Sequence, residues 1–167
     1  MATTETLFPT LLYRAPLGPG ARSLIKDLAK AIRQLAVDDA AGRRWCAANG
    51  YRGYTSYASL DDLAWRNPAF ADLERRLDQH VRAFAKTLAF ERSRALARDS
   101  LWVNLLKPGG AHGGHIHPGS AVSGTVYVEV PRGASAIRFE DPRLPLMMAA
   151  PAVRPSAPRE RQRFINV

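Results

Sequence analysis

Three of the four histidines in this 167-residue chain fall within six residues, at His112, His115 and His117. They lie in a glycine-rich run over residues 109–119, and glycine lets a backbone bend sharply and approach a ligand closely. Imidazole nitrogens are common ligands of transition metals, so the cluster favours a metal site. The alternatives are a solvated loop and, for His112, a residue that orients a ligand histidine without binding the metal itself.

The histidine run stands between two segments that read as β-strands, residues 101–106 and 122–130. Successive side chains of a strand point to opposite faces, so residues two apart point the same way. We therefore expect His115 and His117 to converge on one side of the backbone and to act as metal ligands, with His115 the stronger candidate.

Two polar residues accompany these strands. Asn104 interrupts an apolar segment, and burying its amide costs a few kcal/mol unless the amide is hydrogen-bonded. It is expected either to bond to neighbouring backbone or to face a polar cavity. Tyr127 belongs to the polar face of residues 122–130, whose other face is lined by valines. An apolar back and a hydroxyl-lined front suit the wall of a small barrel with a polar interior.

Helices are predicted in the first half of the chain. Apolar residues recur at helical spacing over residues 21–37, and again from Phe70 to Leu88. Asn67 and Pro68 form a typical helix start, with an asparagine cap and proline at the first helical position. Helices followed by a strand-rich half indicate an α+β fold. We expect one domain over residues 1–167, mainly helical over 1–99 and strand-rich over 100–167.

Composition places the chain among ordinary globular proteins, with 46% hydrophobic and 23% charged residues. No apolar run reaches transmembrane length and no secretory signal is visible, so no membrane partner is expected. The single cysteine, Cys46, cannot form an internal disulfide and is expected to be a buried thiol. These features favour a cytoplasmic protein.

The net charge of +9 raises the question of nucleic-acid binding. The arginines are spread along helical stretches and several lie near acidic residues, and no basic run is interleaved with aromatics for base stacking. A solvated basic face is therefore favoured over a nucleic-acid interface. The tyrosines Tyr51, Tyr54 and Tyr57 could line a site, form its rim or contribute to a homo-oligomer interface.

A set of short motifs spans nearly the whole chain: Leu7-Phe8-Pro9-Thr10, Gly53-Tyr54-x-Ser56-Tyr57, Asn67-Pro68-x-Phe70, Trp102-x-Asn104, His115-x-His117-Pro118, Ser123-Gly124-x-x-Tyr127-Val128 and Phe139-x-Asp141-Pro142-Arg143. Together they resemble a family of 2-oxoglutarate/Fe(II) oxygenases found among small bacterial and phage proteins. The resemblance implies a double-stranded β-helix, the cupin-like jelly roll, buttressed by N-terminal helices.

The resemblance also implies the chemistry. Members of this superfamily use Fe(II) and the small-molecule cosubstrate 2-oxoglutarate to oxidise a C–H bond of a primary substrate, which the sequence does not identify. His115 and His117 would then be the iron ligands. Asn104 and Tyr127 would bind 2-oxoglutarate, because both are expected to face the barrel interior.

The sequence departs from the superfamily pattern in two respects. The usual ligand motif is His-x-Asp/Glu with a distant histidine, whereas His117 occupies the carboxylate position and no histidine follows it. We expect the last strands of the jelly roll, with the distant histidine and a basic 2-oxoglutarate anchor, to lie beyond Val167, so that the sequence is a fragment.

Two other functions are compatible with the residues. One is a metal-binding jelly-roll or cupin module without turnover. The spacing from Gly109 to His115 and His117 resembles the first cupin motif, although Ala121 and Val122 stand where cupins carry a glutamate. The other is a nucleic-acid-binding domain, which only the net charge supports.

Overall fold

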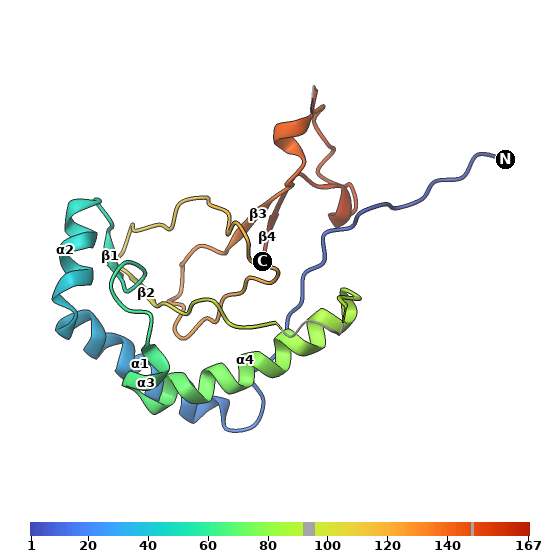
Figure 1. The fold of residues 1–167 in the computed structure, drawn as a ribbon. Coiled ribbons are helices and arrows are strands. Elements are labelled where there is room, and N and C mark those ends of the chain that lie inside the picture. The colour runs from blue at the N-terminus through green and yellow to red at the C-terminus, as the bar shows by residue number, and fades with distance from the viewer. Residues whose placement is uncertain (92–95, 148) are drawn as a thin grey trace. The chain divides into compact units, whose positions relative to one another are not determined.

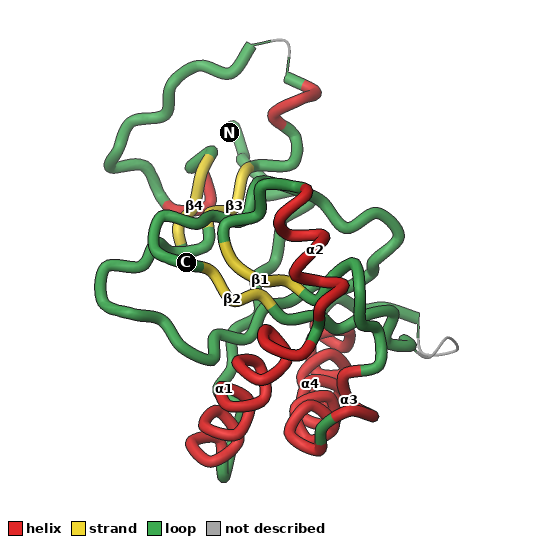
Figure 2. Tube along the Cα trace, turned by 90° about the vertical axis from the view of Figure 1, so that its left-hand side faces the viewer, coloured by secondary structure: helices red, strands yellow, loops and turns green. Residues whose placement is uncertain are grey.

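The computed structural model describes residues 1–91, 96–147 and 149–167. They divide into two compact units, Met1–Val128 and Glu129–Val167, which are considered separately. The described elements, in chain order, are α1 (Ala21–Asp38), α2 (Ala40–Ala48), β1 (Gly53–Thr55), α3 (Leu63–Arg66), α4 (Pro68–Thr87), β2 (Asn104–Leu106), β3 (Arg138–Glu140), the 3-10 turns η1 (Leu144–Leu146) and η2 (Arg159–Arg161), and β4 (Phe164–Asn166) (Figures 1 and 2).

The helices α1 and α4 form the base of the first unit and pack against each other (Figure 1). Both were predicted from their apolar spacing, and both are confirmed. Helix α4 begins as expected, because Asn67 Oδ1 accepts a 2.9 Å hydrogen bond from the Ala69 N–H and proline follows at the first helical position.

The hydrophobic core lies between these helices and the short sheet. Phe70 of α4 and Leu28 of α1 are almost completely buried. Each such side chain contributes roughly 1.5–3 kcal/mol relative to an exposed one. The other buried core residues are Leu24, Ala31, Ile32, Tyr54, Leu63, Leu73 and Val103. Since Tyr54 and Val103 come from β1 and the approach to β2, the core fixes the sheet on the helices.

Helix α2 was not predicted. Asp39 begins it by accepting a 2.9 Å hydrogen bond from the Gly42 N–H, and the same carboxylate accepts hydrogen bonds from Tyr54 and Ser59. Hydrogen bonds from Gly42, Ser59 and Tyr54 outweigh the effect of burial and lower the pKa of Asp39. Cys46 of α2 is buried, as expected, and its sulfur accepts a hydrogen bond from the Thr55 N–H.

The strands form two antiparallel pairs within the described residues. In the first unit β1 pairs with β2, in the register Gly53↔Leu106 and Thr55↔Asn104 (Figure 2). Ser56 extends this contact, because its N–H and hydroxyl oxygen both bond to the backbone of Val103. In the second unit β3 pairs with β4, with Phe139 opposite Ile165.

Mixed helices and small antiparallel sheets agree with the predicted α+β class. The jelly roll and the single domain stay predictions, since the described residues contain only two-stranded sheets. Residues 122–130 were expected to form a strand and form none in the described structure. Their alternating pattern is a property of side chains, whereas a strand also needs a neighbour for its backbone hydrogen bonds.

No described helix has the length and apolar character needed to cross a membrane.

Candidate functional site

The predicted histidine cluster is present in the first unit. The ring centroid of His115 lies 4.7 Å from that of His112 and 4.9 Å from that of His117. His112 and His115 are exposed and His117 is half-buried. The sequence placed the three side chains close along the chain, and the structure brings their rings into contact. We refer to His112, His115 and His117 as the histidine cluster.

In His115 and His117, the hydrogen bonds at Nδ1 determine which ring nitrogen remains available to bind a metal. The Nδ1 atom of His115 lies 2.8 Å from the Gly113 carbonyl oxygen. A carbonyl oxygen only accepts, so this Nδ1 carries the proton and the lone pair of the neutral ring is on Nε2. The Nδ1 atom of His117 contacts the hydroxyl of Ser123. A histidine that binds a metal through one nitrogen usually donates its other N–H in this way.

His112 is bonded to a residue from the N-terminal half. The hydroxyl of Tyr51, which lies between α2 and β1, is 3.2 Å from His112 Nδ1 and 3.2 Å from Asn104 Oδ1. Burial raises the pKa of Tyr51 to about 12, so this hydroxyl keeps its proton at neutral pH. Burial and the neighbouring charges of His115 and His117 lower the pKa of His112, which favours its neutral form.

Glycines allow the histidine-bearing loop to lie against β1. A Cβ on Gly110 would sit 2.4 Å from the carbonyl oxygen of Arg52, far inside contact distance. The same carbonyl accepts a 3.2 Å hydrogen bond from the Lys107 N–H. Gly109 has a φ of 74°, in the left-handed region that favours glycine. The close approach brings the loop within reach of Tyr51.

Aromatic rings border His117. The Trp102 ring makes edge contacts with His117 and with Tyr57, at centroid distances of 5.5 Å and 5.3 Å. Edge-to-face geometry is a favourable arrangement for aromatic pairs. Trp102 and Asn104 lie two residues apart, and in a strand such residues point to the same face. Trp102 contacts His117, and Asn104 contacts Tyr51, which in turn contacts His112.

The four residues predicted for the site have different outcomes. His115 and His117 are adjacent, and Asn104 joins the cluster through Tyr51. Tyr127 is 52% exposed, and within the described chain no hydrogen bond or ring contact connects it to the cluster. Its expected orientation followed from the strand over 122–130, which is not formed.

Tyr51 and Trp102 were missed as residues of the site. Tyr51 is 61 positions from His112, and nothing in the local spacing could connect them. The tyrosine-rich segment was identified as one that could line a site, but the sequence does not distinguish Tyr51 from Tyr54 or Tyr57. Trp102 has the better signal, since it shares a strand face with Asn104.

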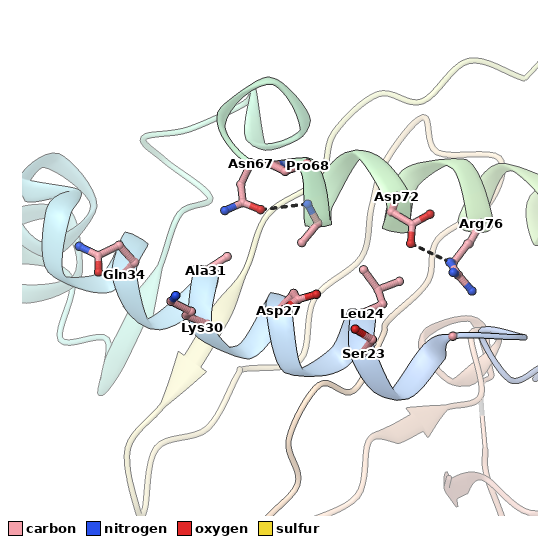
Figure 3. Close-up of a pocket in the computed structure, with 12 residues that line it drawn as sticks. Ser23, Leu24, Asp27, Lys30, Ala31, Gln34, Asn67, Pro68, Asp72 and Arg76 are labelled. Carbon is pink, nitrogen blue, oxygen red and sulfur yellow. Dashed lines mark hydrogen bonds and ion pairs between the residues drawn. The ribbon is translucent and has the colours of Figure 1, made fainter.

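A separate cavity of about 630 Å³ lies between α1 and α4 (Figure 3). Asp72 pairs with Arg76 at a distance of 3.1 Å, and Asn67 caps the start of α4 farther along the cavity (Figure 3). It is lined by Gly20, Ser23, Leu24, Asp27, Lys30, Ala31, Gln34, Asn67, Pro68, Ala69, Asp72 and Arg76. The cavity shares no residue with the histidine cluster.

The donor chemistry of the cluster suits a transition metal. Nε2 of His115 carries a free lone pair, and its Nδ1–H is engaged by a carbonyl, as in many metal-bound histidines. Imidazole nitrogen is a ligand for iron, zinc, copper and nickel. No set of three His, Cys, Asp or Glu side chains in residues 1–91, 96–147 and 149–167 is grouped to hold an ion. The ligand assignment is therefore limited to the pair His115 and His117.

Comparison with protein families bears on this region. Residues 100–167 match the family model described as "Putative 2OG-Fe(II) oxygenase". The match includes the whole histidine cluster and Asn104. It confirms the family resemblance for residues 100–167, which are less than half of the chain. The family implies Fe(II) and 2-oxoglutarate. No curated protein matches the chain.

Proposed function

We propose that this chain carries the metal centre of an Fe(II)- and 2-oxoglutarate-dependent oxygenase that oxidises a C–H bond of its substrate. The observation that carries the proposal is the coincidence of the family match with the histidine cluster. Within the matched residues lie two adjacent imidazoles, one of them with its Nδ1–H engaged by a carbonyl oxygen.

His115 and His117 would hold the iron through Nε2. The Gly113 carbonyl and the Ser123 hydroxyl contact the opposite nitrogens, so they would orient both rings. When bound, Fe(II) and 2-oxoglutarate together supply the oxidising power that the side chains lack. The task of the protein is to hold these groups in place and to direct the substrate towards them.

Asn104 is the candidate partner for 2-oxoglutarate on this chain. Its Oδ1 is occupied by the Tyr51 hydroxyl, and its Nδ2 group is a hydrogen-bond donor suited to a carboxylate. Tyr127, whose side chain is 52% exposed, is proposed as a second hydrogen-bond donor to 2-oxoglutarate. The net charge of +9 favours the approach of a dianionic cosubstrate.

The proposed setting is a cytoplasmic protein whose helices buttress a jelly roll over residues 100–167. The first experiment needs only the metal and the cosubstrate.

The test uses the longest natural version of this chain as wild type and compares it with His115→Ala and with a matched control, His80→Ala. His80 is the one histidine outside the cluster, and it bonds to Tyr13 on the surface of α4. Purified proteins are loaded with Fe(II) without oxygen, and bound metal is measured after desalting. Succinate formation from 2-oxoglutarate is then followed in air. We expect iron binding and succinate from the wild type and from His80→Ala, and neither from His115→Ala.

Two other outcomes would change the proposed function. Iron that binds through His115 without succinate formation would support a metal-binding module without turnover. Equal iron in all three proteins, or none in any, would remove the metal centre from the histidine cluster and with it the proposed oxygenase.

A further inference from the structure

The Tyr51 hydroxyl contacts two residues of the candidate site at once. It lies 3.2 Å from Asn104 Oδ1 and 3.2 Å from His112 Nδ1. The hydroxyl has one proton to donate and lone pairs to accept with. Asn104 Oδ1 is a carbonyl oxygen and can only accept, so the Tyr51 proton points to Asn104.

The direction of the first bond determines the second. With its proton directed to Asn104, the Tyr51 oxygen can only accept at His112, so His112 Nδ1 must carry a proton. In the neutral ring Nε2 then holds the lone pair. One hydroxyl therefore sets the hydrogen-bond direction of an amide and an imidazole.

We infer that Tyr51 is a positioning residue that fixes the Nδ1–H tautomer of His112 and leaves the Asn104 Nδ2–H group free for an anionic ligand. The identity of that anion as 2-oxoglutarate rests on the proposed function. Tyr51 lies outside residues 100–167, the part of the chain that the family model matches. The inference thus adds a residue from the helical half of the chain to the site.

The surroundings of Tyr51 suit a fixed role. Its ring contacts Trp45 of α2 at a centroid distance of 6.4 Å and meets His112 edge-on at 5.8 Å. Its N–H donates to the Cys46 carbonyl, and the next carbonyl, that of Arg52, binds the Lys107 N–H. The backbone on both sides is thereby tied to α2 and to the end of β2.

The central test is Tyr51→Phe, which keeps the ring and removes only the hydroxyl. The tautomer of His112 is read from ¹⁵N chemical shifts of the ring nitrogens in the metal-free full chain at neutral pH. We expect Nδ1–H in the wild type and a shift towards Nε2–H in Tyr51→Phe, which is the form that free histidine prefers. An unchanged His112 tautomer in Tyr51→Phe would overturn the inference.

The chain offers a matched control. The hydroxyl of Tyr13 lies 3.1 Å from Nδ1 of His80, a residue of α4, so this contact also joins a tyrosine hydroxyl to a histidine Nδ1. Tyr13→Phe should alter the ring signals of His80 and leave those of His112 unchanged. A response of His112 to Tyr13→Phe would mean that the shifts report a general change of structure, and would count against a specific role for Tyr51.

A second variant gives a result that a purely structural role would not produce. In Asn104→Ala the Tyr51 proton loses its acceptor and becomes available to His112 Nδ1. We expect His112 to change to the Nε2–H tautomer while Tyr51 is still present. Retention of Nδ1–H in Asn104→Ala would contradict the proposed direction of the two hydrogen bonds.

The cosubstrate part is tested by calorimetry with 2-oxoglutarate on the iron-loaded proteins without oxygen. Loss of the bond that orients Asn104 should weaken 2-oxoglutarate binding by about three- to tenfold in Tyr51→Phe. Equal affinity in Tyr51→Phe and wild type would overturn this part. Failure of the wild type to bind 2-oxoglutarate would instead count against the proposed function, and the tautomer experiment would still decide the role of Tyr51.

Discussion

The Tyr51 hydroxyl lies 3.2 Å from His112 Nδ1, although the two residues are 61 positions apart. This bond joins the end of α2 to the glycine-rich loop. It depends on a close approach of the backbones, at which the Gly110 Cα faces the Arg52 carbonyl. The geometry of the histidine cluster is therefore set from outside its own loop.

The first prediction concerns this approach. Gly110→Ala would place a Cβ 2.4 Å from the Arg52 carbonyl oxygen, so the loop must move away from β1. We expect a loss of about 1–3 kcal/mol in the free energy of unfolding, as in other overpacked sites. We also expect His112 to lose the Nδ1–H tautomer, because the Tyr51 hydroxyl no longer reaches it. Urea unfolding and ¹⁵N shifts measure both.

Gly113→Ala is the matched control for Gly110→Ala. No atom beyond the two neighbouring residues lies within 4 Å of the Cβ position at Gly113, and its φ is not in the left-handed region. Its stability should stay within about 0.5 kcal/mol of wild type, as at most surface positions. Equal losses in the two variants would show that the contact with Arg52 is not the reason that position 110 requires glycine.

The second prediction concerns metal and stability. A ligand that binds only the folded state stabilises it by mass action, by about 2.7 kcal/mol at a hundred times its dissociation constant. Co²⁺, an oxygen-stable substitute for Fe(II), should therefore raise the unfolding temperature of wild type and of His80→Ala. A chelator should reverse the shift without unfolding the protein, because the core around Phe70 and Leu28 contains none of the cluster histidines.

The same measurement on His115→Ala completes the metal test. We expect no shift with Co²⁺ in this variant and an unchanged unfolding temperature without metal, since His115 is exposed. A shift as large as that of the wild type would place the bound metal elsewhere on the chain.

The third prediction concerns the start of α4. Asn67→Ala removes the side-chain acceptor for the Ala69 N–H and should cost about 1 kcal/mol of stability. Asn49→Ala is the control, since Asn49 donates to the Trp45 carbonyl at the exposed end of α2 and caps no helix N-terminus. Guanidinium unfolding of both variants gives the comparison. A loss at Asn49 as large as that at Asn67 would argue against a capping role.

The fourth prediction concerns pH and the second unit. Hydrogen bonds from the Arg143 side chain and backbone to the Asp141 carboxylate, with Arg163 nearby, lower its pKa to about 2 from an unfolded value of 3.8. A carboxyl with a depressed folded pKa stabilises the protein above the unfolded pKa. That contribution is lost as the pH falls through the folded value.

Asp141→Asn tests whether the ionised carboxylate of Asp141 stabilises the folded state. Wild type should be more stable than Asp141→Asn above about pH 5, and the difference should shrink as the pH falls from 3.8 towards 2. Urea unfolding across this range measures it. A difference that stays constant down to pH 2 would mean that the ionised carboxylate does not stabilise the folded state.

The fold was predictable where the pattern is local. Helices α1 and α4 follow from apolar spacing and from the Asn67–Pro68 start. Strand β2 lies within residues 101–106, a segment predicted to be a strand. Helix α2 was missed because it is short and its signal is the single cap Asp39, which also bonds to Tyr54 and Ser59.

The candidate site was predictable only in part, for a related reason. The spacing of His115 and His117 indicated their proximity, and their role as metal ligands stays a prediction. The strand expected over residues 122–130 was wrong for the described structure, because alternation does not supply a pairing partner. The contact of Tyr51 with His112 depends on how two distant segments meet, which no local spacing encodes.

The pairing of β1 with β2 has a further consequence for the segment that the family model matches. Residue 100 falls inside the first compact unit, ahead of β2, and the partner strand of β2 comes from the preceding half of the chain. Ser56, which bonds to the backbone of Val103 just before β2, also comes from that half. The matched segment is thus not an autonomous module. A polypeptide of residues 100–167 alone would leave β2 as an open edge, expose Val103 and lose the Tyr51 hydroxyl that contacts Asn104 and His112. The matched segment therefore depends on the helical half of the chain for its packing and for the geometry of the histidine cluster.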